Sequence, residues 1–132
     1  MGSKTNYLEK KLLDHALGVA AYTHPTPVYL AVFTTDPTDA GTQTGEPSGG
    51  SYAREEITFG AASGDSPGTS SNSVAVTFTT ATGSWGTLAY WGIMDAVSAG
   101  NMLYHGAATD SRAIDAGDTL EAAIGAIVIT ED

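Results

Sequence analysis

The sequence of 132 residues contains no cysteine. This absence excludes disulfide bonds, thiolate metal ligands and a thiol nucleophile. It does not indicate a cellular compartment, because a protein without cysteine can function in either a reducing or an oxidising environment. The length fits one compact domain, and a chain of this size buries enough apolar surface to form a core without covalent cross-links.

Basic residues are also scarce. Five Lys and Arg residues face fifteen Asp and Glu residues, so the formal net charge is −10. A chain with this charge is repelled by nucleic acid and by anionic membrane surfaces, and we expect neither as a partner. The sequence has no apolar run of about 18 residues and no apolar signal-peptide core, so we expect no membrane span.

Charged residues make up only 15% of the chain, whereas Gly, Ala, Ser and Thr are abundant. This composition favours strands, turns and close subunit contacts over a long helical protein carrying many salt bridges.

The first segment carries the helical pattern of the chain. Apolar residues recur with a helical period, and charged residues fill the other side. Asn6 is expected to cap this helix, with Glu9 completing a capping-box pattern, and Gly18 to end it. The apolar face must cover either the body of the same domain or a neighbouring subunit. Its members are Leu8, Leu12, Leu13, Ala16, Leu17 and Ala20.

After the two prolines of "THPTP", the pattern changes to short β-type runs separated by turn residues. Residues 87–96 and 101–109 are expected to form a hairpin, and 119–130 a terminal strand with a bulge at Gly125. A terminal helix is the alternative for 119–130, but Ile127 to Thr130 favour a strand. The other expected strands are 28–35, 52–59 and 74–80, with polar loops at 36–50 and 60–73.

These runs predict a mainly β fold: an antiparallel β-sandwich, jelly-roll or Ig-like, of six to eight strands with a short N-terminal α-helix. A parallel α/β fold would require crossover helices, and the pattern shows none after residue 20. We therefore divide the chain into an N-terminal docking or packing helix, 1–20, and a β-sandwich domain, 21–132.

Metal-binding patterns are weak. His15, His24 and His105 lack the short spacing that prearranges metal ligands. Asp36 and Asp39 precede Gly41 in a segment that resembles a calcium loop, but the alternating oxygen ligands and closing Glu are missing. Asp residues commonly form turns through bonds to nearby amides. We predict a turn here and, for the same reason, in 114–119, and expect no metal and no cofactor.

Catalytic patterns are weaker still. The segment "GGSYA" lacks the second glycine of a nucleophile elbow and precedes a strand instead of a helix. Glu55 and Glu56 are adjacent in a predicted strand, so their side chains point to opposite faces. No glycine-rich stretch ends in the Lys of a phosphate-binding loop. We predict that the protein is not an enzyme and assign no catalytic residue.

Three further residues are predicted to contact other protein. Trp85 lies between glycines in "TGSWGT", which makes it the best candidate for an exposed aromatic anchor. A position in the core or at a protein interface is favoured over contact with a glycan. Tyr52 and Arg54 lie at the base of a long loop, and Arg54, one of five basic residues, is expected to pair with a carboxylate in this chain or the next. With Leu8, Leu12 and Leu13, they complete the candidate interface residues.

Several segments together resemble a known family. The sequence is similar, nearly from end to end, to small tailed-bacteriophage virion proteins described as tail fibre or fibre-adaptor proteins. That resemblance implies a structural protein and transfers no catalytic residue. The segments that carry it are "YLEKKLLDHALG", "VYLAVFTTDPTDAGT", "SGGSYAREEITFGAAS", "TATGSWGTLAYWGIMDAVSAGNMLYHGA" and "AGDTLEAAIGAIVIT".

The sequence and the resemblance therefore predict a non-enzymatic virion protein, assembled in the bacterial cytoplasm. We expect a tail fibre or fibre-attachment adaptor that forms a symmetric oligomer and contacts other virion proteins. One alternative is a capsid decoration or head-surface protein. Another is a host-receptor or glycan-binding module that uses Trp85 and the loops 36–50 and 60–73.

Overall fold

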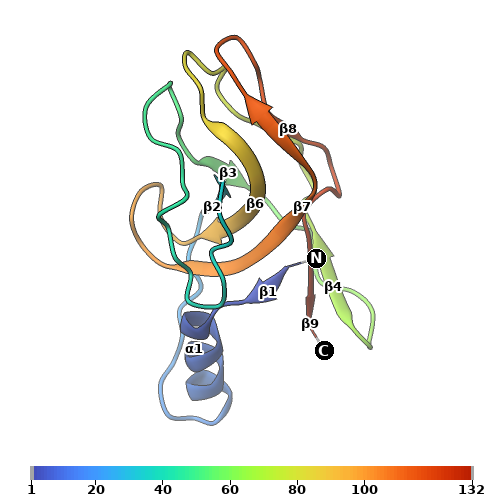
Figure 1. Cartoon of the computed structure of the whole chain (residues 1–132). Coiled ribbons are helices and arrows are strands. Elements are labelled where there is room, and N and C mark those ends of the chain that lie inside the picture. The colour runs from blue at the N-terminus through green and yellow to red at the C-terminus, as the bar shows by residue number, and fades with distance from the viewer. Residues whose placement is uncertain (1, 132) are drawn as a thin grey trace.

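The fold is mainly β. A computed structural model of the chain describes residues 2–131 and contains, within them, one α-helix and nine strands (Figure 1). In chain order, the elements are β1 (Ser3–Lys4), α1 (Asn6–Ala16), β2 (Val28–Phe33), β3 (Glu55–Ile57), β4 (Gly68–Ser71), β5 (Val76–Thr77), β6 (Gly86–Met94), β7 (Met102–Ile114), β8 (Glu121–Ala122) and β9 (Val128–Glu131).

A five-stranded antiparallel sheet in the order β1-β7-β6-β2-β3 forms the larger layer. Its centre is the β6–β7 hairpin, which runs from the pair Gly86–Ile114 to the pair Met94–Met102. This hairpin confirms the one predicted from residues 87–96 and 101–109. Two antiparallel pairs, β4–β9 and β5–β8, complete a sandwich-like body, as the alternating pattern predicted.

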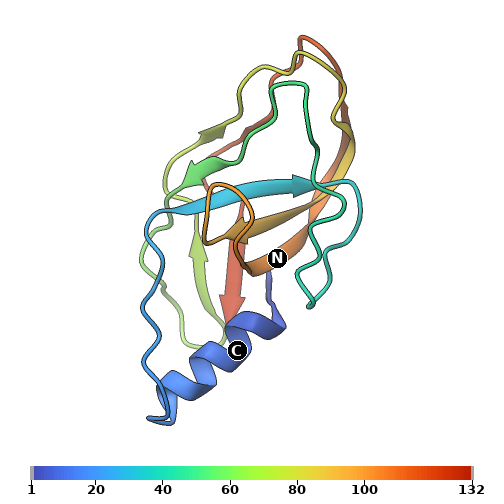
Figure 2. The same cartoon turned by 90° about the vertical axis from the view of Figure 1, so that its left-hand side faces the viewer.

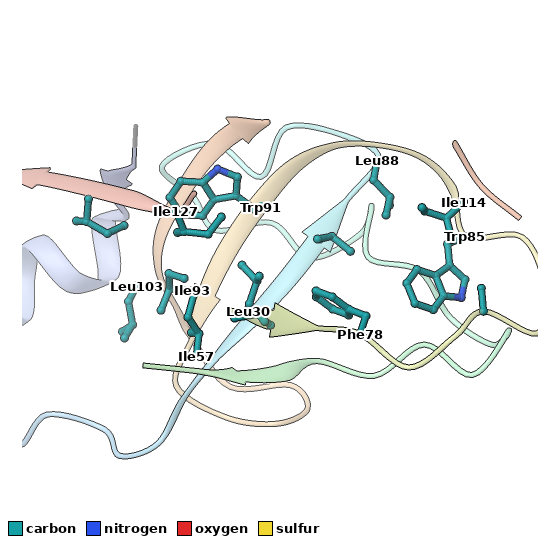
Figure 3. Close-up of a cluster of buried hydrophobic side chains, with 14 of the residues drawn as sticks. Leu30, Ile57, Phe78, Trp85, Leu88, Trp91, Ile93, Leu103, Ile114 and Ile127 are labelled. Atoms are coloured by element: carbon teal, nitrogen blue, oxygen red, sulfur yellow. The ribbon is translucent and has the colours of Figure 1, made fainter. Parts of the chain in front are cut away.

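The main hydrophobic cluster fills the space between these layers (Figure 3). Its side chains come from almost every element, so burial of this cluster, the main stabilising contribution, holds distant parts of the sequence together. Figure 3 shows Leu30, Ile57, Phe78, Trp85, Leu88, Trp91, Ile93, Leu103, Ile114 and Ile127.

The terminal run 119–130 is two strands, so the prediction of one strand with a bulge is wrong. A turn at Gly125, with φ of +78°, separates β8 from β9. Buried Asn72 holds this turn: its side-chain amide donates to the carbonyl of Ala123 and its side-chain oxygen accepts from the backbone amide of Ile127, each at 2.9 Å. A polar side chain distant in the sequence therefore decides where the strand breaks.

The loop predicted at 60–73 is also partly wrong, because it contains β4, which pairs with β9. Small polar residues gave this segment no apolar alternation. In the run predicted as a strand at 74–80, Val76 and Phe78 are buried, but Val74 is exposed because the regular strand begins only at Val76. The strand predicted at 52–59 is regular only over Glu55–Ile57.

The chain enters the sheet before it forms the helix. Gly2 donates its backbone amide to the carbonyl of Val128 at 2.9 Å, and β1 then pairs with β7. The helix follows directly and extends below the β body in both views (Figures 1 and 2). The first residues of the predicted 1–20 segment therefore belong to the sheet, and only the following helix projects from it.

Candidate functional site

The helix α1 is fixed to the body at its first turn. Thr5, which is buried, is the N-cap: its Oγ1 accepts from the backbone amide of Leu8 at 3.4 Å and donates to the carbonyl of Met102 at 2.6 Å. The predicted cap at Asn6 is wrong, since Asn6 already lies within the helix. The predicted end at Gly18 is confirmed by a φ of +74°, a conformation that glycine adopts without strain.

The apolar face of α1 is covered only near its start. Leu8 is 3% exposed and belongs to the main core, and Leu12 packs partly against that core. Further along, Leu13 is 59% exposed, and Leu17 and Val19 are each 73% exposed. Leu13 and Leu17 are four residues apart, so they lie on one side of the helix. The end of the helix therefore carries a large apolar surface that its own chain leaves in solvent.

A groove opens on the side of the body. Its volume is about 480 Å³, and apolar side chains of the core, including Leu88, Trp91 and Ile127, form part of its wall. Three charged residues also line it: the acidic Asp110 and Glu121 and the basic Arg112. No strand pairing joins β7 to β8 across the groove: within the described residues, β7 pairs with β1 only at Tyr104 and His105, and β8 pairs with β5 alone.

An irregularity in β7 lies at the wall of this groove. Leu88 pairs with Arg112, and Tyr90 pairs with Ala107, so residues 108–111 stand opposite Ala89 alone. Such an insertion bends its strand away from its partner and commonly re-aims side chains at a functional edge.

A buried ion pair holds the long loop that precedes β3. Arg54 Nε donates to Glu46 Oε1 at 2.7 Å and Arg54 Nη2 to Glu46 Oε2 at 2.8 Å, while Nη1 donates to the carbonyls of Ala96 and Ala99. Burial lowers the pKa of Arg54, but the hydrogen bonds and charge of Glu46 outweigh this effect, so the pKa is raised overall. The prediction that Arg54 meets a carboxylate is confirmed, within the same chain.

Tyr52 belongs to the same cluster. Its hydroxyl donates to Glu46 Oε1 at 2.8 Å and accepts from the backbone amide of Val32 at 3.3 Å. Burial, followed by the negative charge of Glu46, raises the pKa of Tyr52 well above its usual value. Both Tyr52 and Arg54 are thus used to stabilise this chain, whatever else they contact.

Trp85 is not an exposed anchor but lies in the core, one of the alternatives that the sequence left open. Its side chain is 4% exposed and packs edge-on against Tyr52, with ring centres 5.2 Å apart. Its Nε1 donates to the carbonyl of Gly50 at 2.9 Å. A Cβ on residue 50 would lie 3.0 Å from that indole nitrogen, so the glycine allows the loop to approach the ring. The glycines that flank Trp85 in the sequence suggested an exposed turn, whereas the close packing depends on Gly50 from a distant loop.

The histidines and acidic turns have local structural roles. Nδ1 of His15 accepts from the backbone amide of Tyr22 at 3.0 Å, and His105 Nε2 lies 2.9 Å from Asp39 Oδ1. Asp36 Oδ1 accepts from the amide of Thr38, the turn predicted for this segment. Within residues 2–131, no group of three or more His, Asp or Glu side chains is placed to hold a metal ion.

The sequence predicted no membrane-spanning segment. Among the residues that the structure describes, no helix is both long enough and apolar enough to cross a bilayer.

The sequence did not predict the groove. Its walls come from β2, β6, β7 and the segment 120–128, whose proximity depends on the three-dimensional fold. The hydrophobic pattern of the sequence does not indicate that β7 and β8 stay unpaired with each other. By contrast, the exposed helix face was visible as a pattern, although sequence alone left open whether its own domain covers it.

Comparison with known families assigns the chain to a family. The family model described as "Podophage GP4 fiber I protein gp80" matches residues 3–130 of the chain. No curated protein matches the sequence.

Proposed function

The chain belongs to this podophage fibre protein family and is a structural fibre protein, and from this premise we propose that it is a non-enzymatic fibre-attachment adaptor. It is built into the virion by contacts with neighbouring virion proteins and works as a symmetric oligomer. Assembly takes place in the host cytoplasm before the particle is complete.

The exposed end of α1 is the observation that carries the proposal. Leu13, Leu17 and Val19 place large apolar side chains in solvent at a site that projects from the body (Figure 2). Contiguous exposed apolar surface on a soluble domain marks a site of protein contact. An amphipathic helix also commonly binds by placing its apolar face in a partner's groove. A fibre adaptor requires such an attachment point.

The remainder of the chain supports a structural role. Buried polar side chains in the described residues all have hydrogen-bond partners, and the strongest cluster, Arg54 with Glu46, fastens one loop to two neighbouring segments. A fully satisfied cluster of this kind stabilises a shape and has no free group left for a reaction. The glycan alternative loses its anchor, because Trp85 is buried.

The test is virion incorporation. Deleting residues 1–18 would remove β1, Thr5 and Leu8 and so damage the body. Instead, we would introduce Leu13→Gln with Leu17→Gln into the phage genome, with Val97→Gln, at an exposed position outside the helix, as a matched control. Incorporation and labelling of the protein on intact particles and on tailless capsids are then measured.

We expect the helix variant to fold but to be absent from particles, and the control and unaltered proteins to label the tail only. Normal incorporation of the helix variant would contradict attachment through α1. Labelling of tailless capsids would contradict the fibre location and would indicate a head-surface protein.

A further inference from the structure

The exposed helix end and the side groove lie on different parts of the same molecule. In Figure 1, α1 is at the lower end, whereas β8, at the edge of the groove, is at the upper end. The helix cannot turn back into its own groove, because Thr5 and Leu8 anchor its first turn in the body. Any occupant of the groove therefore comes from another molecule.

The net charge of the helix segment is opposite in sign to that of the body. Residues 1–20 contain three Lys and two acidic residues, for a net charge of +1. Residues 21–132 contain two Arg and thirteen acidic residues, for a net charge of −11. The helix segment of one copy is therefore attracted to the negatively charged body of another copy, whereas two bodies repel each other. Electrostatic complementarity of this kind favours one orientation of encounter.

The same complementarity applies at the groove. Asp110 and Glu121 line it beside the apolar wall and outnumber the one basic lining residue, Arg112. On α1, Lys10 lies three residues before Leu13 and seven before Leu17, so all three share one side of the helix. Lys10 makes no ion pair within the described residues. A helix that inserts Leu13 and Leu17 into the groove carries Lys10 to its acidic edge.

We propose that α1 of one copy docks in the groove between β7 and β8 of a second copy. Leu13, Leu17 and Val19 fill the apolar part of the groove, and Lys10 pairs with Asp110 or Glu121. This deepens the proposed function and rests on it, since it names a second copy as the partner of the same helix face.

The contact is head-to-tail, because two different surfaces meet. A head-to-tail contact leaves one free helix and one free groove in a dimer, so it continues until a ring closes or a filament grows. A closed ring satisfies every helix and groove at once and provides the symmetric oligomer of an adaptor.

Engineered cysteines test the contact directly, because the natural chain contains none. Full-length Leu17→Cys is mixed with full-length Ala107→Cys, whose residue lines the groove, and treated with a short thiol cross-linker. The matched control replaces Ala107→Cys with Ser48→Cys, at an exposed loop position away from the groove. We expect cross-linked pairs of the first mixture at several times the yield of the second.

Equal yields in both mixtures would overturn the proposal. So would efficient cross-linking of Leu17→Cys with itself, which would indicate a two-fold contact between helices.

Sedimentation over a concentration series supplies the second measurement. We expect self-association to weaken at least about tenfold in Leu13→Gln with Leu17→Gln, as for loss of a central interface residue. Lys10→Glu should also weaken it, and mixing Lys10→Glu with Glu121→Lys should restore it. An unaltered protein that remains monomeric throughout would overturn the proposal. If the helix variant were nevertheless lost from virions, the adaptor function would stand with a different virion protein as partner.

Discussion

Arg54 Nε and Glu46 Oε1 are 2.7 Å apart in the interior of the protein, and the arginine side chain is 3% exposed. The pair joins the long loop after β2 to the entrance of β3. Through Nη1, Arg54 also holds the carbonyls of Ala96 and Ala99 in the β6–β7 loop. One basic side chain thus fixes two loops that have no regular structure of their own.

Glu46→Gln should destabilise the protein strongly. The substitution keeps the shape but removes the charge that compensates buried Arg54, and breaking a buried pair in this way costs about 3–5 kcal/mol. Urea unfolding measures the free energy of unfolding. Glu56→Gln, at an exposed position in β3, is the control and should change it by less than about 0.5 kcal/mol. Similar losses in both variants would contradict a special role for Glu46.

The pairing of Arg54 with a carboxylate could be predicted for two reasons. A rare basic residue in an acidic chain has many possible partners, and burying its charge without a partner costs much free energy. Sequence could not identify Glu46 within a loop of turn residues. The central hairpin was also predictable, since β6 and β7 are long, apolar and adjacent in the chain. Local pattern decided this part of the fold.

The terminal run shows where local pattern fails. Residues 119–130 favour one strand, yet Asn72, about fifty positions earlier, binds the backbone at Ala123 and Ile127 and divides the run. The sequence could not decide between core and surface for Trp85 for a related reason, because its environment comes from Gly50, Tyr52 and distant strands. The groove likewise lies where β7 and β8 stay unpaired with each other, which follows from contacts between segments that no periodicity reveals.

The stability of the protein should fall as the pH rises above about 10. Tyrosine in the unfolded chain loses its proton near pH 10, whereas burial and Glu46 raise the pKa of Tyr52 in the folded protein. The folded state therefore keeps a proton that the unfolded state has lost, and unfolding is favoured. Tyr52 contributes a loss of up to about 1.4 kcal/mol per pH unit, while its contribution is fully retained below pH 10.

Tyr52→Phe tests the origin of this loss. Urea unfolding between pH 8 and pH 11, from about two units below to about one unit above the tyrosine value, should give a shallower decline for this variant than for the unaltered protein. Tyr90→Phe loses a hydroxyl outside the cluster and is the control. Parallel declines for Tyr52→Phe and the unaltered protein would show that Tyr52 is not responsible.

Thr5→Val should destabilise the first turn of α1. Valine keeps the shape of the side chain but removes the hydroxyl that caps Leu8 and binds the carbonyl of Met102. Loss of an N-cap together with a buried hydrogen bond costs about 1–2 kcal/mol. Thr5→Ser retains the hydroxyl and should recover most of this amount. Urea unfolding followed by the helical circular dichroism signal is the measurement, and equal losses in Val and Ser variants would contradict the role of the hydroxyl.

Trp85→Ala should lower the stability of the β body, and we expect no separate loss of binding. The indole packs against Tyr52 and Phe78, so its removal leaves a cavity and costs about 3–5 kcal/mol. Trp85→Phe keeps part of the packing but leaves the Gly50 carbonyl without its donor, and its loss should be smaller. Val97→Ala, at an exposed position, should change the free energy of unfolding by less than about 0.5 kcal/mol. If Trp85→Ala unfolded at the same urea concentration as the unaltered protein, the indole would have to lie at the surface, and a contact role for Trp85 would return.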